Sequence, residues 1–384
     1  MKLQIGITKN KYSFKLLFLL FNILFISCTI NTYDDVSIID PTFNLKWNKA
    51  YEEDTLEKSI IGLRWALSYI GAKLPTSLNG ITSKYNSIEI DIEKLGFNEG
   101  AKQKLTVLHN KIKASDEYHT TNAIDLGRYV TLLIGASEHY YEITEVPLHL
   151  DSILNKYTLL PEKGYVNNSG VSLEHRIISF SEPGGLNQLF LCTETDTVSS
   201  NILEYESIEI LPNGQLRFGI FDKDGNRKNN ANPIHSNAGK PAKCMWCHES
   251  SILPLFKVQN NFNGYLPYLE FQNRLLEYRG AHNTLKNALA DGVDYYQTQQ
   301  HTLTELLYVS FMEPSAKRLS LEWGISLSEV QGKLSGLPTH NHEEFHFLGD
   351  LYHRKDVETH APFEGLQVSS NVREQSEIEV NYIN

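Results

Sequence analysis

Apolar residues recur at helical spacing in the first third of the chain. Over residues 54–70 they lie about one helical turn apart, at Leu56, Ile60, Leu63, Leu67 and Ile70. Such a stripe is typical of an amphipathic helix. Asp54 or Thr55 is suited to cap this helix, and Gly71 is suited to end it. The pattern therefore predicts a helix over residues 54–70.

Two more helical patterns follow in the same region. Asn98 is suited to cap a helix. The apolar face of that helix would be formed by Ala101, Leu105, Leu108 and Ile112. A third pattern covers about residues 122–140. Together they predict a helical region over residues 46–160.

Between residues 161 and 228 the pattern changes to short runs rich in Ile, Phe, Leu and Tyr. The runs cover residues 175–180, 188–193, 204–211 and 215–221. In the last run Leu216, Phe218 and Ile220 alternate with other residues, which is typical of a strand. The turn signal Pro212-Asn213-Gly214 separates the last two runs. The sequence therefore predicts an antiparallel β region over residues 161–228 that includes a hairpin.

Helical patterns return after a loop at residues 229–243 that is rich in Gly, Pro and Asn. They predict helices at residues 268–278, 301–313, 315–323 and 328–334. Ser326 and Glu329 have the spacing of a capping box before the last of these. The elements together predict an α+β fold that is mainly helical, with a helical N-terminal portion, a small antiparallel sheet and a helical C-terminal portion.

The first residues of the chain have the pattern of an export signal. A segment with four Lys and no acidic residue precedes the apolar stretch 16–26, which is too short to span a bilayer. The stretch runs into Phe25-Ile26-Ser27-Cys28 and resembles a bacterial lipoprotein signal. This resemblance implies a signal peptide at 1–27, a lipid on Cys28, and a polar tether over 28–45. An ordinary signal peptide with a chance cysteine is the alternative.

Composition and charge narrow the classes of function. The 384 residues carry a formal net charge of −11, which argues against a nucleic-acid partner because phosphate neutralisation needs a basic surface. The 20 Tyr and 17 Phe residues argue against a disordered chain. Four Cys are too few for a disulfide scaffold of this length. We therefore expect a globular body anchored to a membrane of the bacterial cell envelope by its N-terminal lipid, either periplasmic or surface-exposed.

Cys244-Met245-Trp246-Cys247-His248 is a CxxCH sequence, and through it the chain resembles c-type cytochromes. The resemblance implies a cytochrome c-like haem region over residues 229–335. It implies that Cys244 and Cys247 form thioethers to the vinyl groups of one haem c, and that His248 is the proximal ligand of the iron. Export agrees with this resemblance, because bacterial c-type haem is attached outside the cytoplasm.

The resemblance implies one-electron transfer with a redox partner protein in the cell envelope. An electron carrier is expected here rather than a catalyst, and a single CxxCH argues against a di-haem peroxidase. Three other interpretations of the motif stay open. These are a redox or structural disulfide, half of a zinc site, and coincidence. A redox disulfide of the thioredoxin kind should follow a strand, and the loop before Lys243 has no strand pattern.

Haem iron needs a sixth ligand or an open face. Met312 is the candidate distal ligand, because Met1 is removed with the signal and Met245 lies inside the attachment motif. Core packing is the alternative role for Met312. His235 and His282 are the next candidates. The remaining Cys192 lies in an apolar run, and we expect it to be a buried, inert thiol.

A second motif lies in the C-terminal segment 336–384, which is rich in histidine. His342-Glu343-Glu344-Phe345-His346 matches HExxH, the zinc-binding helix of many metalloproteases, with His342 and His346 as ligands and Glu343 as base. The alternative functions are therefore an HExxH zinc metallohydrolase and an envelope interaction lipoprotein that works without haem. The simpler interpretation of this segment is a solvated, partly amphipathic helix, with at most an adventitious metal site.

Overall fold

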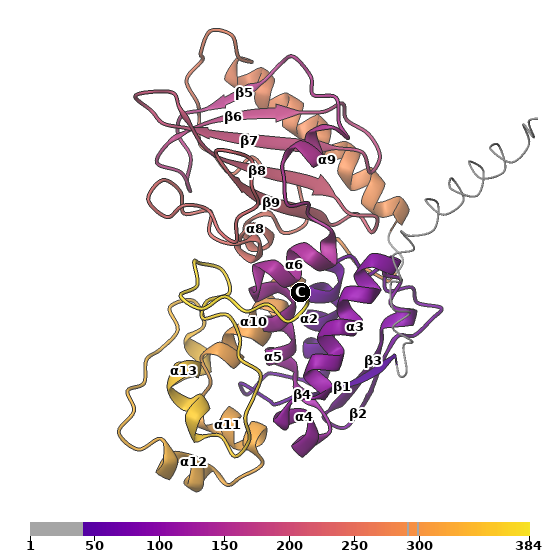
Figure 1. Cartoon of the computed structure of the whole chain (residues 1–384), viewed down its shortest axis with the longest axis vertical. Helices are drawn as coiled ribbons and strands as arrows, with labels where there is room; N and C mark the ends of the chain where they lie inside the picture. The colour runs from indigo at the N-terminus through magenta and orange to yellow at the C-terminus, as the bar shows by residue number, and fades with distance from the viewer. Residues whose placement is uncertain (1–40, 290–291, 298) are drawn as a thin grey trace, which may run out of the picture. The chain divides into compact units, whose positions relative to one another are not determined.

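Two β-sheets organise the part of the chain that the computed structural model describes, residues 41–289, 292–297 and 299–384 (Figure 1). The first sheet has the strand order β2-β3-β1-β4, which are Ile81–Lys84, Ser87–Asp91, Thr42–Lys46 and Ile124–Asp125. The second has the order β5-β6-β7-β8-β9, which are Gly164–Val166, His175–Phe180, Leu189–Thr195, Ile202–Ile210 and Leu216–Asp222. The predicted signal peptide, its lipidation site Cys28 and most of the predicted tether lie outside the described residues.

The first sheet is mixed, because β1 is antiparallel to β3 but parallel to β4. Its strands bury alternate residues, among them Phe43 and Leu45 of β1. Two long helices belong to the same part of the chain, α2 (Leu56–Tyr69) and α3 (Glu99–Lys113). The predicted caps are confirmed, since the side chains of Thr55 and Asn98 accept hydrogen bonds from backbone N–H groups in the first turns of α2 and α3.

The shorter helices of this part complete it. They are η1 (Ile92–Lys94), α4 (Asp116–Thr121), α5 (Leu126–Val130), the π-helical η2 (Thr131–Gly135), α6 (Ser137–Thr144) and α7 (Asp151–Leu154). The prediction of a helical region over 46–160 missed three strands, because β2, β3 and β4 lie within it. The predicted tether 28–45 also overlaps β1. These strands have two to five residues, too few for alternation to stand out beside a helical stripe.

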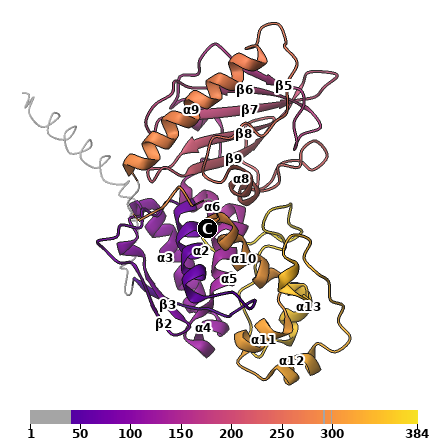
Figure 2. The same cartoon turned by 180° about the vertical axis from the view of Figure 1, so that it is seen from behind.

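The second sheet is antiparallel throughout and confirms the predicted β region and its hairpin. One face, here called the inner face, carries a row of rings and aliphatic side chains. The register places Phe180 opposite Phe190, Phe190 opposite Ile208, and Ile208 opposite Phe218. The ring of Tyr278 lies 4.9 Å from that of Phe190. The helix that carries Tyr278, α9 (Tyr268–Leu289), therefore covers this face, and Figure 2 shows it lying across the sheet.

The remaining helices follow the second sheet along the chain. They are α8 (Pro241–His248), α10 (Gln300–Met312), α11 (Ala316–Trp323), α12 (Leu327–Lys333), η3 (His346–Leu348), α13 (Arg354–Val357) and η4 (Glu358–His360). The capping box of Ser326 and Glu329 is confirmed at the start of α12. No helix among the described residues has both the length and the apolar character needed to cross a membrane.

The prediction of a mainly helical fold with a helical cytochrome c-like C-terminal portion is wrong. The fold is α+β, but sheets of four and five strands make up more of it than was predicted. Helix α8 packs against β9 and α6, whereas α10 packs against α2 and α5. Residues 229–335 are therefore shared between the two sheets and form no helical domain of their own. Helical spacing shows which face of a helix is buried, but it does not show which element covers that face.

Candidate functional site

Helix α8 places the three residues of the CxxCH motif on one face. Cys244, Cys247 and His248 are separated by three and four residues, and side chains at that spacing lie together on a helix. Ala242 and Met245 face the core instead. Pro241 begins the helix, where its fixed φ is favourable. The spacing of the motif thus places two thiols and one imidazole on the same side of the helix.

That side of the helix faces a pocket between α8 and the inner face of the second sheet. Cys244, Cys247 and His248 all line it, and its cavity has a volume of about 160 Å³ and is partly open to solvent. Most of its walls are apolar, and they include Val166, Ile178, Phe190, Ile208, Leu253, Leu255, Phe256, Phe271 and Leu275. An apolar lining with a few polar side chains is typical of small-molecule and cofactor sites.

His248 is the most constrained of the three motif residues. Its ring lies 5.6 Å from that of Phe218 on β9. Its Nδ1 is buried without a hydrogen-bond partner. Burial lowers the pKa of His248 to about 4. The imidazole is therefore neutral at physiological pH, which is the form that binds a metal ion.

The two motif cysteines are free thiols. Burial raises the pKa of Cys244 and of Cys247, so both are protonated at neutral pH. A catalytic disulfide instead needs a thiolate of lowered pKa, commonly at a helix N-terminus. Cys244 and Cys247 lie beyond the first three residues of α8. The pocket therefore does not favour the interpretation of the motif as a redox disulfide.

A zinc site at the motif finds no support in the described residues either. Within them, one group of three or more His, Cys, Asp or Glu side chains has ligand atoms close enough to share an ion, and it consists of Glu194, Glu204 and Glu206. Neither Cys244 nor His248 belongs to it. The ligands that a zinc ion would need beside the motif are therefore not gathered there.

Charged side chains line the pocket next to its apolar walls. Arg176 on β6 donates from Nη2 to Glu206 Oε1 at 3.0 Å and to Ser236 Oγ at 2.9 Å. Its Nε is buried without a hydrogen-bond partner. Lys243 on α8 also lines the pocket and forms an ion pair with Glu374. An anionic group bound here would therefore find one guanidinium N–H free to donate.

Cys192 lines the same pocket, a position that the sequence did not predict. Burial raises the pKa of its thiol, which agrees with the expected inert character. The alternation of side chains along β7 could have indicated the position of Cys192, because Phe190 and Cys192 are two residues apart and so point to one face. All three cysteines of the described chain therefore line one pocket.

The candidate sixth ligands lie elsewhere. Met312 ends α10 and packs against the main core, and it is not among the residues that line the pocket. The ring of His282 is buried and forms a hydrogen bond of 2.8 Å between Nε2 and the carbonyl oxygen of Gly214. His235 lies 3.2 Å from Glu174. The structure does not bring any of these three side chains to His248.

Residues 371–379 contact α8 and help to hold it in position. The Lys240 ammonium donates to the carbonyl oxygen of Asn371 at 3.0 Å and to Glu379 at 2.6 Å, and its backbone N–H donates to the carbonyl oxygen of Arg373. The guanidinium of Arg373 lies 4.9 Å from the ring centre of Trp246. A stretch far along the chain therefore holds both the start and the middle of the helix that carries the motif.

The HExxH sequence does not form the helix that a zinc protease needs. Residues 342–345 are not helical, and only the single turn η3 follows them. The Nδ1 atom of His342 accepts hydrogen bonds from the backbone N–H groups of Glu344 and Phe345. His342 and His346 are therefore not placed one turn apart on a helix, which is the arrangement by which HExxH binds zinc.

Comparisons of the chain with known protein families, with curated protein sequences and with solved structures find no match. The side chains of the pocket between α8 and the second sheet are therefore the basis for assigning a function.

Proposed function

We propose that this chain is an exported lipoprotein that carries one covalent haem c in the pocket between α8 and the five-stranded sheet. Cys244 and Cys247 would hold the haem through thioethers, and His248 would be an axial ligand of its iron. The observation that carries the proposal is that all three side chains line one pocket with mainly apolar walls. The lipid on Cys28 would anchor the protein to a membrane of the cell envelope.

The donor set fits such a group. His248 is neutral at physiological pH, and its buried Nδ1 has no hydrogen-bond partner. The rings and aliphatic side chains of β6, β7 and β8 supply an apolar surface for a porphyrin. Lys243 and the unpartnered Nε of Arg176 are suited to meet its carboxylate groups. The proposal concerns attachment and ligation and needs no cytochrome c fold.

The bound haem would supply a one-electron couple. The residues of the pocket would tune it, because an apolar surrounding and the hydrogen bonds of the axial ligand both shift the potential of haem iron. We propose electron transfer with a partner protein of the envelope as its use. Met312 lies outside the pocket and has no part in this proposal.

A pyridine haemochrome spectrum tests the attachment. The chain is co-expressed with the machinery that attaches c-type haem, denatured, and measured for haem that remains bound. We expect one haem per chain, and none in the Cys244→Ser/Cys247→Ser variant. Cys192→Ser is the matched control, because it removes a thiol of the same pocket outside the motif, and it should keep the haem. Absence of covalent haem from the unaltered chain would overturn the proposal.

His248→Ala separates ligation from attachment. The two thioethers should still form, so the haem should stay covalent while the absorption spectrum of the native protein changes. A redox titration of the unaltered protein should then show a reversible one-electron couple. An unchanged native spectrum in His248→Ala would exclude His248 as the iron ligand.

A further inference from the structure

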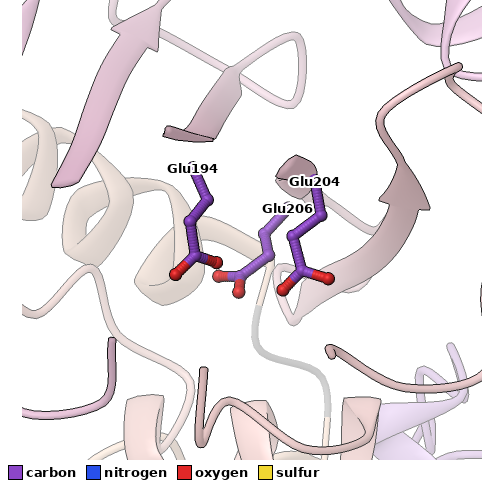
Figure 3. A group of neighbouring side chains, drawn as sticks. All are labelled: Glu194, Glu204 and Glu206. Carbon is purple, nitrogen blue, oxygen red and sulfur yellow. The ribbon is translucent and has the colours of Figure 1, made fainter. Parts of the chain in front are cut away.

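Three glutamates gather on the inner face of the second sheet, beside the pocket. Glu194 lies on β7 directly opposite Glu204 on β8, and Glu206 follows two residues after Glu204. Because side chains of a strand alternate between faces, both residues of β8 point the same way as Glu194. Figure 3 shows the three carboxylates close together at the ends of side chains that extend in one direction.

The spacing of the three carboxylates suits a single ion. One oxygen atom from each lies within 4.8 Å of the others. Hard divalent cations bind carboxylate oxygens at about 2.0–2.6 Å, so two ligands on one such ion are separated by at most about 5 Å. No nitrogen or sulfur ligand belongs to the group. An all-oxygen donor set favours Ca²⁺, Mg²⁺ or Mn²⁺ over zinc or copper.

Two cationic side chains contact the group but do not balance it. Arg176 Nη2 lies 3.0 Å from Glu206 and 3.7 Å from Glu194, and Lys228 Nζ lies 3.1 Å from Glu204. Three carboxylates therefore face two cations, which leaves an excess of one negative charge when all are ionised. A buried excess charge of this kind is costly unless a proton or a cation neutralises it.

The remaining polar contacts leave two oxygen atoms without donors. Ser172 donates to Glu194 Oε1, and the backbone N–H of Asn232 donates to Glu204 Oε2. Glu194 Oε2 and Glu204 Oε1 are buried and accept no hydrogen bond. The two residues are only 0% and 1% exposed, respectively. No donor among the described residues satisfies these oxygens, whereas an ion held between the carboxylates would.

We propose that Glu194, Glu204 and Glu206 bind one hard divalent cation. The side chain of Glu206 is 17% exposed and lines the pocket, so the pocket gives the ion a route in and supplies water to complete its coordination. The site stands on the carboxylate geometry and the two unpartnered oxygens. It does not depend on haem, and the two proposals can fail separately.

Calorimetric titration of the chelator-treated protein with Ca²⁺, Mg²⁺ and Mn²⁺, each in turn, tests the site. We expect one ion per chain for at least one of the three metals, and an affinity at least tenfold weaker in Glu204→Gln. Absence of binding by the unaltered protein, or equal affinity in Glu204→Gln, would overturn the proposal. Mn²⁺ also gives a direct readout, because its electron paramagnetic resonance signal weakens when it binds.

Two more variants distinguish the loss of a metal ligand from misfolding of the sheet. Glu206→Gln removes the most accessible ligand of the three and should also weaken binding at least tenfold. Glu209→Gln is the matched control. Glu209 lies on β8, is buried and forms an ion pair of 2.7 Å with Arg217, but it points to the other face. The Glu209→Gln variant should bind the metal as tightly as the unaltered protein does. A loss of affinity equal to that of Glu206→Gln would contradict the assignment of the three glutamates as ligands.

Discussion

Two groups of buried charges in this molecule have opposite character. The first, here called the arginine cluster, joins α5, α11 and α13 and consists of Arg128, Arg318, Arg354, Glu117, Asp125, Glu322 and Glu358. The second, the glutamate cluster, is formed by Glu194, Glu204 and Glu206 with Arg176 and Lys228. Most of the side chains in both clusters are buried, so the main difference between the clusters lies in the balance of their charges.

The arginine cluster has as many positive as negative side chains. Both oxygens of Asp125 accept from Arg318, and both oxygens of Glu322 accept from Arg354. The guanidinium groups of Arg128, Arg318 and Arg354 all lie over the ring of Phe311, at 3.9–5.7 Å from its centre. Lys46 adds a fourth positive charge within reach of Asp125. Four cations therefore face four carboxylates.

The glutamate cluster has three carboxylates for two cations. Charges that hold a fold together tend to be fully paired, since an unpaired buried charge is costly. The excess charge of the glutamate cluster is therefore neutralised by a proton on Glu194 when no metal is bound, or by the proposed cation. The comparison assigns the arginine cluster to stability and the glutamate cluster to binding.

The largest effect is expected from breaking the arginine cluster. Arg318→Met leaves Asp125 without its main partner and takes one partner from Glu322, so it should lower the free energy of unfolding by about 3–5 kcal/mol. Urea denaturation measures this change. Arg274→Met is the control, because its ion pair of 3.6 Å with Glu277 is on the surface of α9, and it should cost less than about 1 kcal/mol. Equal effects would refute the assignment of the first cluster.

Glu322 of the arginine cluster and Glu194 of the glutamate cluster should respond to pH in opposite directions. Burial alone would raise the pKa of Glu322, but Arg354 and Arg318 lower it to about 2. The stability that Glu322 contributes is therefore complete above its unfolded pKa of about 4.5 and is lost as the pH falls towards 2. The pKa of Glu194, which burial raises to about 8, has the reverse effect. Its contribution is complete below about pH 4.5 and is lost as the pH rises towards 8.

Denaturation of the metal-free protein from pH 3 to 9 tests both predicted changes of stability with pH. Glu194→Gln should remove a decline in stability that amounts to at most about 1.4 kcal/mol per pH unit above pH 5. Glu322→Gln should change the acid side instead. Glu117 of the arginine cluster also has a pKa raised by burial, to about 7, so the difference between variant and parent is the quantity to compare. Parallel curves for all three proteins would contradict the predicted signs.

The smallest effect should come from neutralising the glutamate cluster without metal. Glu204→Gln removes the excess negative charge while keeping the shape of the side chain. It also weakens the contact to Lys228, so the two changes oppose one another. We expect the free energy of unfolding at pH 8 to change by less than about 1 kcal/mol, far less than for Arg318→Met. A loss of several kcal/mol in urea denaturation would mean that the cluster is structural after all.

Much of the local structure follows from the sequence. Helix α2, the Asn98 cap of α3 and the hairpin of β8 and β9 were predictable, because a stripe of apolar residues, a capping side chain and a turn signal are local features. Strand β1 was not, since its five residues offer only Phe43 and Leu45 as buried positions. The parallel pairing of β1 with β4 joins residues about eighty positions apart, and no local pattern encodes such a partner.

The candidate site was also predictable only in part. The common face of Cys244, Cys247 and His248 follows from helical geometry alone. The walls of the pocket do not, because they come from β5 to β9 and the loop 252–256 and are assembled only by the fold. Strand β8 alternates Glu204, Glu206 and Ile208 with residues of similar polarity. Its pattern therefore does not show which face is buried, and the glutamate cluster could not be foreseen.

The contacts of segment 371–379 with α8 also have a consequence for the order of events during biosynthesis. Asn371 meets the Lys240 ammonium across 131 residues of sequence, so the segment is translated long after the motif. Until it arrives, Lys240 and Trp246 lack their contacts with this segment, and α8 is held by its packing against β9 and α6 and by the hydrogen bond of Lys240 to the carbonyl oxygen of Gly135. The thiols of the motif therefore have an interval in which a modifying enzyme can reach them. Docking of the segment would then close that interval.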